Sequence, residues 1–264
     1  MPNEKFDPKN FTAPKAKPLP VFLLLDVSTT MGEVLDAENL KRTGETFFKD
    51  GKHWEVVEGG VSRMDLLNDA VVKMLKSFSE EEKLETEISL TIITFGDTAT
   101  LHISPTVASE VKWENLIPDG ETALGAALRM AKSMLEDKQI TPSRAYRPTI
   151  VLVSDGQPND EWEKALEEFI TKGRSSKCDR MAMAIGPDAD RTVLGKFIQD
   201  TPHQLFSEDN ATKILEFFQR VTMSVTTRSR STNPNKIPVV SIFNPGTTGS
   251  ELESLSDLDD EGYW

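Results

Sequence analysis

The stretch that most constrains this chain is an unbroken apolar run, Val21 to Leu25, that ends abruptly in polar residues. Such a run, preceded by Pro20, is typical of a strand that is buried on both faces of a sheet. Three oxygen-bearing side chains follow it at alternate positions, Asp26, Ser28 and Thr30. In an open α/β sheet, ligands bind beyond the carboxyl ends of the strands. The sequence therefore predicts a buried central strand with a polar site at its end.

Strand and helix patterns alternate along the rest of the chain. Further strands are expected at 88–95, 98–103, 149–153, 179–185 and 203–206. Helices are expected at about 63–78, 123–137, 160–173, 190–199 and 210–226, with one helical turn within 107–117. This alternation is typical of βαβ units with right-handed crossovers. We therefore predict an α/β fold with a doubly wound, mostly parallel sheet, one antiparallel edge strand and helices on both faces.

Composition divides the chain into three parts. Residues 1–17 are polar, contain three prolines and predict a flexible arm. Residues 18–228 carry the strands and helices and predict one domain. Residues 229–264 are rich in Ser, Thr, Asn, Pro and Gly and then acidic, a composition typical of poorly ordered segments. Within them, 237–243 is apolar enough to dock as a strand or to bind a partner.

Residues 36–62 predict an insertion close to the first polar loop. Asp50-Gly51 separates two apolar stretches, which is a typical signal for a β-hairpin over residues 40–60. A long ordered loop is the alternative. We expect the insertion to lie near the binding face, where it shapes partner choice or partly covers the site.

Charge and cysteine content exclude several functions. The formal net charge is −13, which argues against a general affinity for nucleic acid or for anionic membranes. A single cysteine, Cys178, permits neither an intramolecular disulfide nor a cysteine-based zinc site. The first residues lack the features of a secretory signal, and no apolar run approaches the roughly 20 residues that span a bilayer. We expect a cytoplasmic protein.

Two further strand ends or turns supply oxygen ligands, Thr122 and Asp155, in addition to Asp26, Ser28 and Thr30. Hydroxyl and carboxylate oxygens suit Mg²⁺, Mn²⁺ or Ca²⁺ better than zinc or copper. The first loop must curl after Asp26 if its three side chains are to converge, because an extended strand would spread them apart. For Asp26 or Thr122 taken singly, the alternative is a helix cap.

These segments carry a resemblance to a known family. Asp26-Val-Ser28-Thr-Thr30, Thr122 in Asp-Gly-Glu-Thr-Ala-Leu-Gly, and Asp155 in Val-Ser-Asp-Gly-Gln-Pro resemble the metal-ion-dependent adhesion site (MIDAS) of von Willebrand factor type A (VWA) domains. The order of strands and helices over 18–228 is similar to that Rossmann-like family. Short strings, such as Leu-Pro-Val-Phe-Leu-Leu-Leu-Asp and Ala-Ile-Gly-Pro-Asp-Ala-Asp, resemble the bacterial TerY-type proteins of tellurium-resistance clusters.

The resemblance implies a role for each residue. Ser28 and Thr30 would coordinate Mg²⁺, or Mn²⁺ or Ca²⁺, directly. Asp26 and Thr122 would bind it directly or through water, and Asp155 would act mainly through a bound water. A carboxylate from a partner protein would complete the site. The implied function is a non-enzymatic, metal-dependent protein-binding module that serves as adaptor or scaffold in a bacterial stress-response or defence system, alongside a kinase and a phosphatase.

The chain departs from the family pattern at two places. Thr30 stands where serine is usual, which keeps the hydroxyl and adds a methyl group that could crowd the site. Residues 36–62 are longer than the corresponding segment of most family members.

Two other functions compete with the binding module. One is a Mg²⁺-dependent hydrolase or phosphotransfer enzyme, and the other is a regulatory subunit of an AAA-type ATPase. A haloacid-dehalogenase-type phosphatase would need a second carboxylate where Ser28 stands, and neither a nucleophile elbow nor a phosphate-binding Gly-Lys-Ser/Thr loop is present. None of His53, His102 and His203 is placed as an obvious base for Ser28, so the sequence favours a protein that is not an enzyme.

Overall fold

The computed structural model describes residues 16–36, 40–49, 51–81, 86–208 and 211–238. Most of the expected N-terminal arm (1–15) and of the expected C-terminal tail (239–264) lies outside these residues. So do residue 210, where the last helix is expected to begin, and most of the apolar stretch 237–243.

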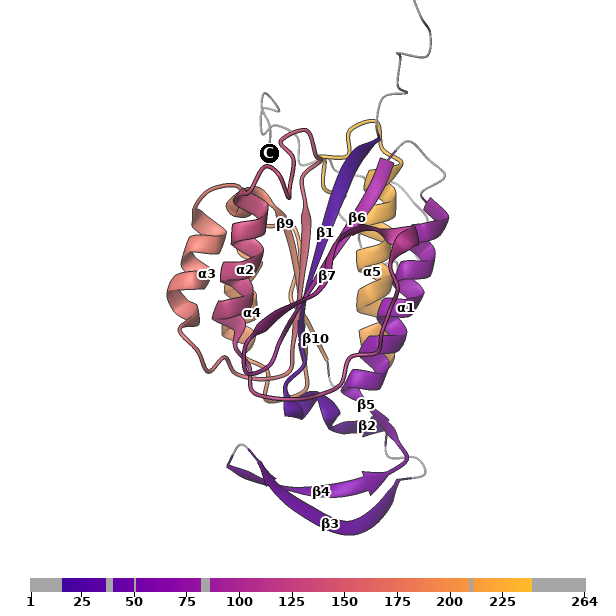
Figure 1. The fold of residues 1–264 in the computed structure, drawn as a ribbon, viewed down its shortest axis with the longest axis vertical. Helices are drawn as coiled ribbons and strands as arrows, with labels where there is room; N and C mark the ends of the chain where they lie inside the picture. The colour runs from indigo at the N-terminus through magenta and orange to yellow at the C-terminus, as the bar shows by residue number, and fades with distance from the viewer. Residues whose placement is uncertain (1–15, 37–39, 50, 82–85, 209–210, 239–264) are drawn as a thin grey trace, which may run out of the picture.

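The main sheet has six strands in the order β10-β9-β8-β1-β6-β7. Five of them are parallel, and the edge strand β7 pairs antiparallel with β6. The strands are β1 (Lys17–Asp26), β6 (Thr86–Phe95), β7 (Ala99–Val107), β8 (Thr149–Ser154), β9 (Asp179–Ile185) and β10 (Phe206–Glu208). The predicted doubly wound, mostly parallel sheet is confirmed, and β1 lies at its centre (Figure 1).

Helices cover both faces of this sheet (Figure 1). On one face lie α1 (Arg63–Glu81) and α5 (Ala211–Ser229), and on the other lie α2 (Leu124–Glu136), α3 (Trp162–Thr171) and α4 (Arg191–Phe197). Each face has its own apolar core, and β1 contributes alternate residues to both: Leu23 and Leu25 face one, Phe22 and Leu24 the other. This explains the unbroken apolar run, since every residue from Val21 to Leu25 is buried.

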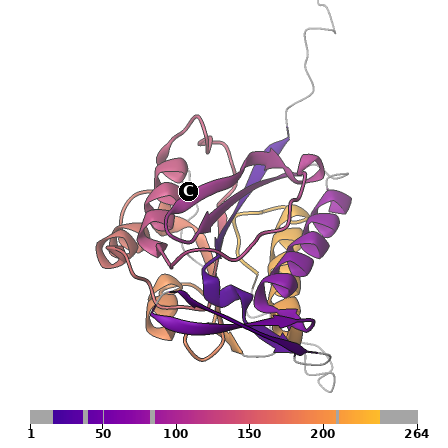
Figure 2. The same ribbon diagram turned by 60° about the horizontal axis from the view of Figure 1, so that its bottom comes forward.

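Residues 33–62 leave the domain as an insertion at its carboxyl edge, the edge where the parallel strands end. A short antiparallel pair, β2 (Val34–Asp36) with β5 (Val61–Ser62), forms its base. Beyond it, β3 (Lys41–Lys49) pairs with β4 (Lys52–Glu58), which confirms the hairpin over the loop alternative. The hairpin lies across the carboxyl edge (Figures 1 and 2).

Local sequence signals explain where several helices begin. Ser62 and Asp65 form a reciprocal cap on α1: the Ser62 hydroxyl accepts the Asp65 N–H at 3.0 Å, and the Asp65 carboxylate accepts the Ser62 N–H at 2.9 Å. Asp190 accepts the N–H groups of Thr192 and Val193 at the start of α4. The expected turn within 107–117 is the 3₁₀ turn Ala108–Glu110.

The end of the chain differs from the expectation in two ways. The short strand β10 begins at Phe206 rather than at His203, because the His203 ring turns inward to the buried Asp179, with 2.7 Å between its Nε2 and Oδ1. The last helix runs to Ser229, and the segment after it packs on the domain. There the Asn235 side chain accepts the backbone N–H of Arg147 at 2.8 Å.

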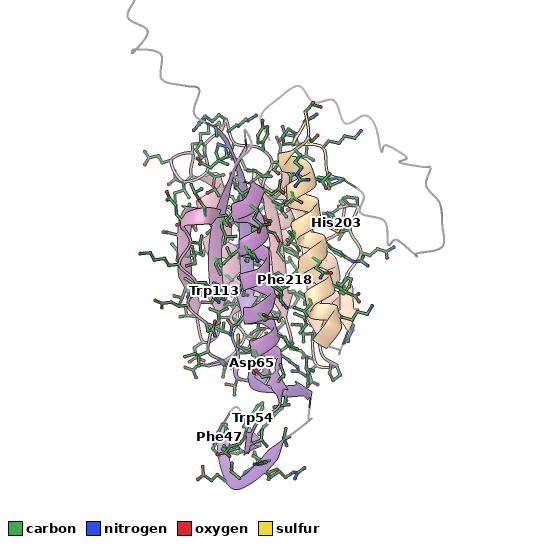
Figure 3. The ribbon with its side chains drawn as sticks, turned by 90° about the vertical axis from the view of Figure 1, so that its right-hand side faces the viewer. Phe47, Trp54, Asp65, Trp113, His203 and Phe218 are labelled. Atoms are coloured by element: carbon green, nitrogen blue, oxygen red, sulfur yellow. The ribbon has the colours of Figure 1, made fainter. Side chains whose placement is uncertain are left out.

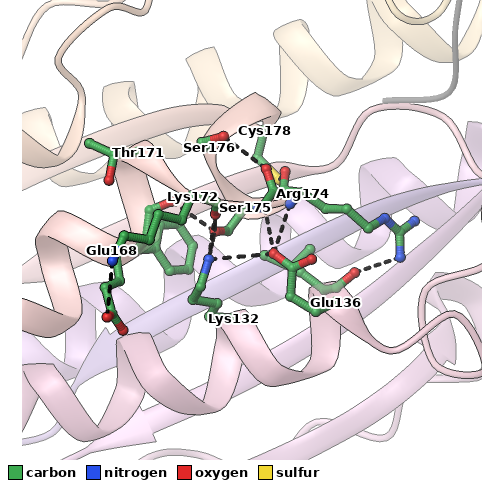
Figure 4. A network of polar contacts seen from close by, with 12 residues as sticks. Lys132, Glu136, Glu168, Thr171, Lys172, Arg174, Ser175, Ser176 and Cys178 are labelled. Carbon is green, nitrogen blue, oxygen red and sulfur yellow. Dashed lines mark hydrogen bonds and ion pairs between the residues drawn. The ribbon is translucent and has the colours of Figure 1, made fainter.

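At the amino edge, opposite the insertion, polar groups pair closely with one another. Around Asp179, His203 and Arg228 approach the same carboxylate, and Arg228 also donates to the Thr149 hydroxyl at 2.6 Å. A second network joins α2 to the segment after α3 (Figure 4). In it, Lys132 donates to the Ser175 hydroxyl at 2.8 Å, and the nearby Glu136 carboxylate accepts the N–H of Arg174.

Candidate metal site

The loop after β1 curls as the sequence requires. The Asp26 carboxylate accepts the backbone N–H of Ser28 at 2.8 Å, and a 3₁₀ turn (Thr29–Gly32) follows directly. As a result the hydroxyls of Ser28 and Thr30 lie 2.9 Å apart. The extra methyl of Thr30 does not turn its hydroxyl away from this point.

Asp155 reaches the same point from the end of the neighbouring strand. Its Oδ1 accepts the Thr30 hydroxyl at 2.8 Å and the Ser28 hydroxyl at 3.3 Å. Ser28 and Asp155 are 127 residues apart in the chain. They meet because β1 and β8 are adjacent parallel strands whose carboxyl ends lie at one edge. Four of the predicted site residues are therefore in one cluster.

Thr122 lines the same pocket and does not cap its helix. The N-cap residue of helix α2 makes no side-chain cap. Instead, the N–H groups of Gly125 and Ala126 in the first turn donate to the Asp160 carboxylate at 2.8 Å each. The Thr122 hydroxyl faces Gly156 so closely that a Cβ there would lie 3.0 Å from it. The capping alternative is therefore wrong for Thr122, whose hydroxyl faces the pocket.

For Asp26, the capping alternative explains only one of the hydrogen bonds that its carboxylate accepts. Besides the Ser28 N–H, it accepts the Ser154 hydroxyl at 2.6 Å, which holds the side chain between β1 and β8. Ser154 was not predicted as a site residue. Its position directly before Asp155 at a strand end is the signal that could have found it.

Two buried carboxylates face each other in this cluster. Burial first, and then the charge of Asp155, raise the pKa of Asp26 to about 7. Burial also raises the pKa of Asp155, against the opposing effects of the Thr30 hydroxyl and Arg63. Both shifts show that the cluster disfavours its own ionised form when no cation is present. Two carboxylates with three hydroxyls form a hard-oxygen donor set, and such a set fits a divalent cation.

Arg63 and Glu33 were missed by the sequence analysis. Arg63, the first residue of α1, donates to Asp155 Oδ2 at 2.8 Å and pairs with Glu33 at 2.8 Å. The helical periodicity could have indicated Arg63. It precedes Leu67 by four residues, so it lies on the buried face of α1, where a charged residue is unusual.

A pocket of about 380 Å³ opens above the cluster. Its floor contains Ser28, Thr30 and Thr122, while Lys52 and Trp54 of the hairpin contribute to its wall. The labelled Trp54 and Phe47 lie on the hairpin below the domain in Figure 3. The insertion therefore lies beside the predicted metal site, and its hairpin lines part of the pocket.

Histidine is not among the described residues that line this pocket. His53 packs against Phe48 on the hairpin, His102 against Trp113 on the edge of the sheet, and His203 on Asp179 at the opposite edge. Their positions agree with the expectation that none serves Ser28 as a base.

Hydroxyls and carboxylates thus gather at the carboxyl end of a central parallel strand, which is where open α/β sheets bind their ligands. The chain matches the model of the von Willebrand factor type A domain over residues 21–157, and it belongs to that family. The matched range contains all five predicted site residues. A search among curated proteins gives no match.

Solved structures support the same fold. The D319A mutant of the PilB minor pilin from Streptococcus sanguinis is similar at 18% identity, over 83% of this chain and 63% of the pilin, with a TM-score of 0.51. Proximal thread matrix protein 1 from the mussel byssus is similar at 15% identity, over 78% of this chain and 46% of that protein, with a TM-score of 0.52.

A further structure of the byssus protein, with a zinc-occupied MIDAS motif, is similar at 15% identity over 78% of this chain and 45% of that chain, with a TM-score of 0.51. At these identities the likeness concerns the fold. The chain spans less than two thirds of the pilin and less than half of the byssus protein. Among the described residues, none of the helices is long and apolar enough to cross a membrane.

Proposed function

We propose that this chain is a divalent-metal-dependent protein-binding module that acts as an adaptor or scaffold. The observation that carries the proposal is the clustering of five oxygen-bearing side chains at the carboxyl edge. Ser28, Thr30 and Thr122 line the pocket, and the buried carboxylates of Asp26 and Asp155 accept hydrogen bonds from the loop that carries Ser28 and Thr30. These residues would hold the ion. The bound ion would supply positive charge that attracts a carboxylate from a partner protein.

Mg²⁺ is the ion we propose first, with Mn²⁺ or Ca²⁺ as substitutes, because the donors are hard oxygens. The byssus protein is described with zinc in its MIDAS motif, so Zn²⁺ belongs among the ions to be tested.

The hairpin supports a protein as the partner. Phe47, which is 44% exposed, stacks across the two strands on Trp54, and Trp54 lines the pocket. Exposed aromatic residues beside a pocket are typical of protein-interaction surfaces. Lys52, at the pocket wall, adds a positive charge that suits an acidic side chain of the partner.

The finer assignment rests on the short strings that resemble TerY-type proteins. On that basis we propose a cytoplasmic role in a bacterial stress-response or defence system, with a kinase and a phosphatase as associated proteins, and no enzymatic activity of its own. The pocket offers no histidine among its described lining residues, and this agrees with a binding role.

The test is a titration of Mg²⁺, Mn²⁺, Ca²⁺ and Zn²⁺ into the wild type, Asp26→Ala and Asp69→Ala, followed by melting temperature and calorimetry. Asp69 is an exposed carboxylate on α1 and serves as the matched control. We expect the melting temperature to rise in the wild type and in Asp69→Ala, because a ligand that binds only the folded state stabilises it.

Asp26→Ala should show no rise. An equal rise in all three proteins would contradict the proposed site. Metal-dependent hydrolysis of phosphate esters that disappears in Asp26→Ala would favour the enzyme alternative instead.

A further inference from the structure

We propose that Arg63 is a fixed internal cation that sets the charge of the metal site. It competes with the divalent ion for Asp155, so that the ion binds weakly by itself and keeps positive charge for a partner's carboxylate. The inference rests on the proposed function, because it takes Asp26 and Asp155 as the carboxylates that hold the ion.

The two oxygens of Asp155 face different groups. Oδ1 accepts the hydroxyls of Ser28 and Thr30, and it therefore faces the proposed ion. Oδ2 is 2.8 Å from Nη1 of Arg63. The same nitrogen donates to the backbone oxygen of Thr30 at 3.3 Å. Arg63 thus contacts two of the three polypeptide segments that form the site, and it is not among the described residues that line the pocket.

The guanidinium is held firmly in this place. Its side chain is 5% exposed, and its Nη2 pairs with Glu33 at 2.8 Å. On the far side it packs against Gly186, where a Cβ would lie 2.6 Å from Nη2. These contacts and the burial hold the guanidinium beside Asp155.

Stability alone is a poor explanation for this arginine. Buried ion pairs often contribute little net stability, because desolvation offsets their attraction. In addition, the Nε of Arg63 is buried and has no hydrogen-bond partner among the described residues. A buried cation with an unsatisfied N–H, touching one of two paired carboxylates, is better explained by its effect on the charge of the site.

The charges show what that effect is. Asp26 and Asp155, both fully buried, carry two negative charges when ionised, and Arg63 reduces the sum to one. A divalent ion then leaves the site with a net positive charge, whereas without Arg63 the site would be neutral. Glu33 offsets Arg63 less than Asp155 does, because its side chain is 35% exposed and is screened by water.

The experiment measures the binding of Mn²⁺ and Mg²⁺ alone by calorimetry, with four full-length proteins: wild type, Arg63→Gln, Arg63→Lys and Arg228→Gln. Arg228 is the matched control, since it is also a buried arginine paired with an aspartate, at the opposite edge. We expect Arg63→Gln to bind the ions about tenfold more tightly than the wild type, since a nearby like charge is removed. Arg63→Lys and Arg228→Gln should keep wild-type affinity.

Equal or weaker binding in Arg63→Gln would overturn the inference while leaving the proposed function intact, provided that the wild type binds. Tight binding in Arg63→Lys would also overturn it, because lysine keeps the charge. Absence of binding in the wild type and in Arg63→Gln would overturn both proposals. If Arg63→Gln does not fold, Glu33→Gln replaces it: loss of the offsetting carboxylate should weaken ion binding severalfold, and unchanged or tighter binding would overturn the inference.

Discussion

Two aspartates in this domain are equally buried and behave in opposite ways. Asp26, at the carboxyl edge, has its pKa raised to about 7, first by burial and then by the charge of Asp155. Asp179, at the amino edge, is also fully buried, and burial again acts to raise its pKa. There, however, the hydrogen bond and charge of His203, with the charge of Arg228, outweigh burial and lower it.

The difference shows at which edge the buried negative charges are already paired with positive groups of the chain. At the amino edge each buried negative charge meets positive groups within the chain, so the network can stabilise the fold without a ligand. At the carboxyl edge Arg63 pairs with Asp155, whereas Asp26 makes no ion pair among the described residues, so the metal-free folded state disfavours the ionised form of Asp26. Such local inconsistency is expected where a protein binds something.

The largest effect should come from breaking the amino-edge network. Asp179→Asn leaves Arg228 buried without its carboxylate and should cost about 3–5 kcal/mol of unfolding free energy. Urea unfolding at pH 7 measures this, with the exposed Asp69→Asn as a control that should change stability by less than about 0.5 kcal/mol. A cost below about 1 kcal/mol would show that the network is not a stabilising one.

The matching substitution at the carboxyl edge should have the opposite sign. Asp26→Asn removes a charge that the metal-free protein disfavours, so at pH 8 it should stabilise the protein by an amount on the order of 1 kcal/mol. It should also abolish stabilisation by Mg²⁺. The same urea experiment, with and without the ion, measures both effects. Destabilisation as large as that of Asp179→Asn would contradict the comparison.

The two edges should also differ in pH dependence. The pKa of Asp26 rises from 3.8 to about 7 on folding, so its contribution to stability is fully present below pH 3.8 and is lost as the pH rises through 7. The pKa of Asp179 falls below 3.8 on folding, so its contribution is present above pH 3.8 and is lost as the pH falls through the lower value.

The measurement is the difference in unfolding free energy between the metal-free wild type and each Asn variant, from pH 2.5 to 8.5. Between pH 5 and 8 the wild type should lose stability relative to Asp26→Asn, whereas its advantage over Asp179→Asn should be lost at the acidic end, below pH 3.8. Parallel profiles for the two variants would show that the two aspartates are equivalent after all.

The smallest effect is expected at Gly156. An alanine Cβ there would press on the Thr122 hydroxyl at 3.0 Å, so Gly156→Ala should weaken Mg²⁺ binding severalfold at a cost of about 1 kcal/mol in stability. Gly195→Ala is the control, because nothing lies within 4 Å of a Cβ at that helical position. It should leave ion binding unchanged and raise stability slightly. Unchanged binding in Gly156→Ala would show that the Thr122 hydroxyl does not contribute to the site.

Much of this arrangement could be predicted from the sequence because it depends on local patterns. The run Val21–Leu25 identified the central strand, and the positions of Asp26 and Asp155 directly after strands placed both at one edge. Parallel strands then bring residues distant in sequence together without any further information.

What could not be predicted depends on which elements pack together. The cap of α2 comes from Asp160, in the segment before α3, and Arg63 meets Asp155 only because α1 begins beneath the metal loop. The shift of the last strand has the same origin, since His203 contacts Asp179 across the sheet edge. No pattern within a single segment indicates such pairs.

The base of the insertion has a consequence for how this domain can diversify. The insertion begins after Glu33 and ends before Arg63, and the backbone N–H of Arg63 donates to the backbone oxygen of Glu33 at 3.0 Å. With its two ends tied together, the segment between them can change in length at little entropic cost, about 0.6 kcal/mol for each doubling. We therefore expect that a different hairpin could be grafted between these ends without altering the sheet or the oxygens of the predicted ion site.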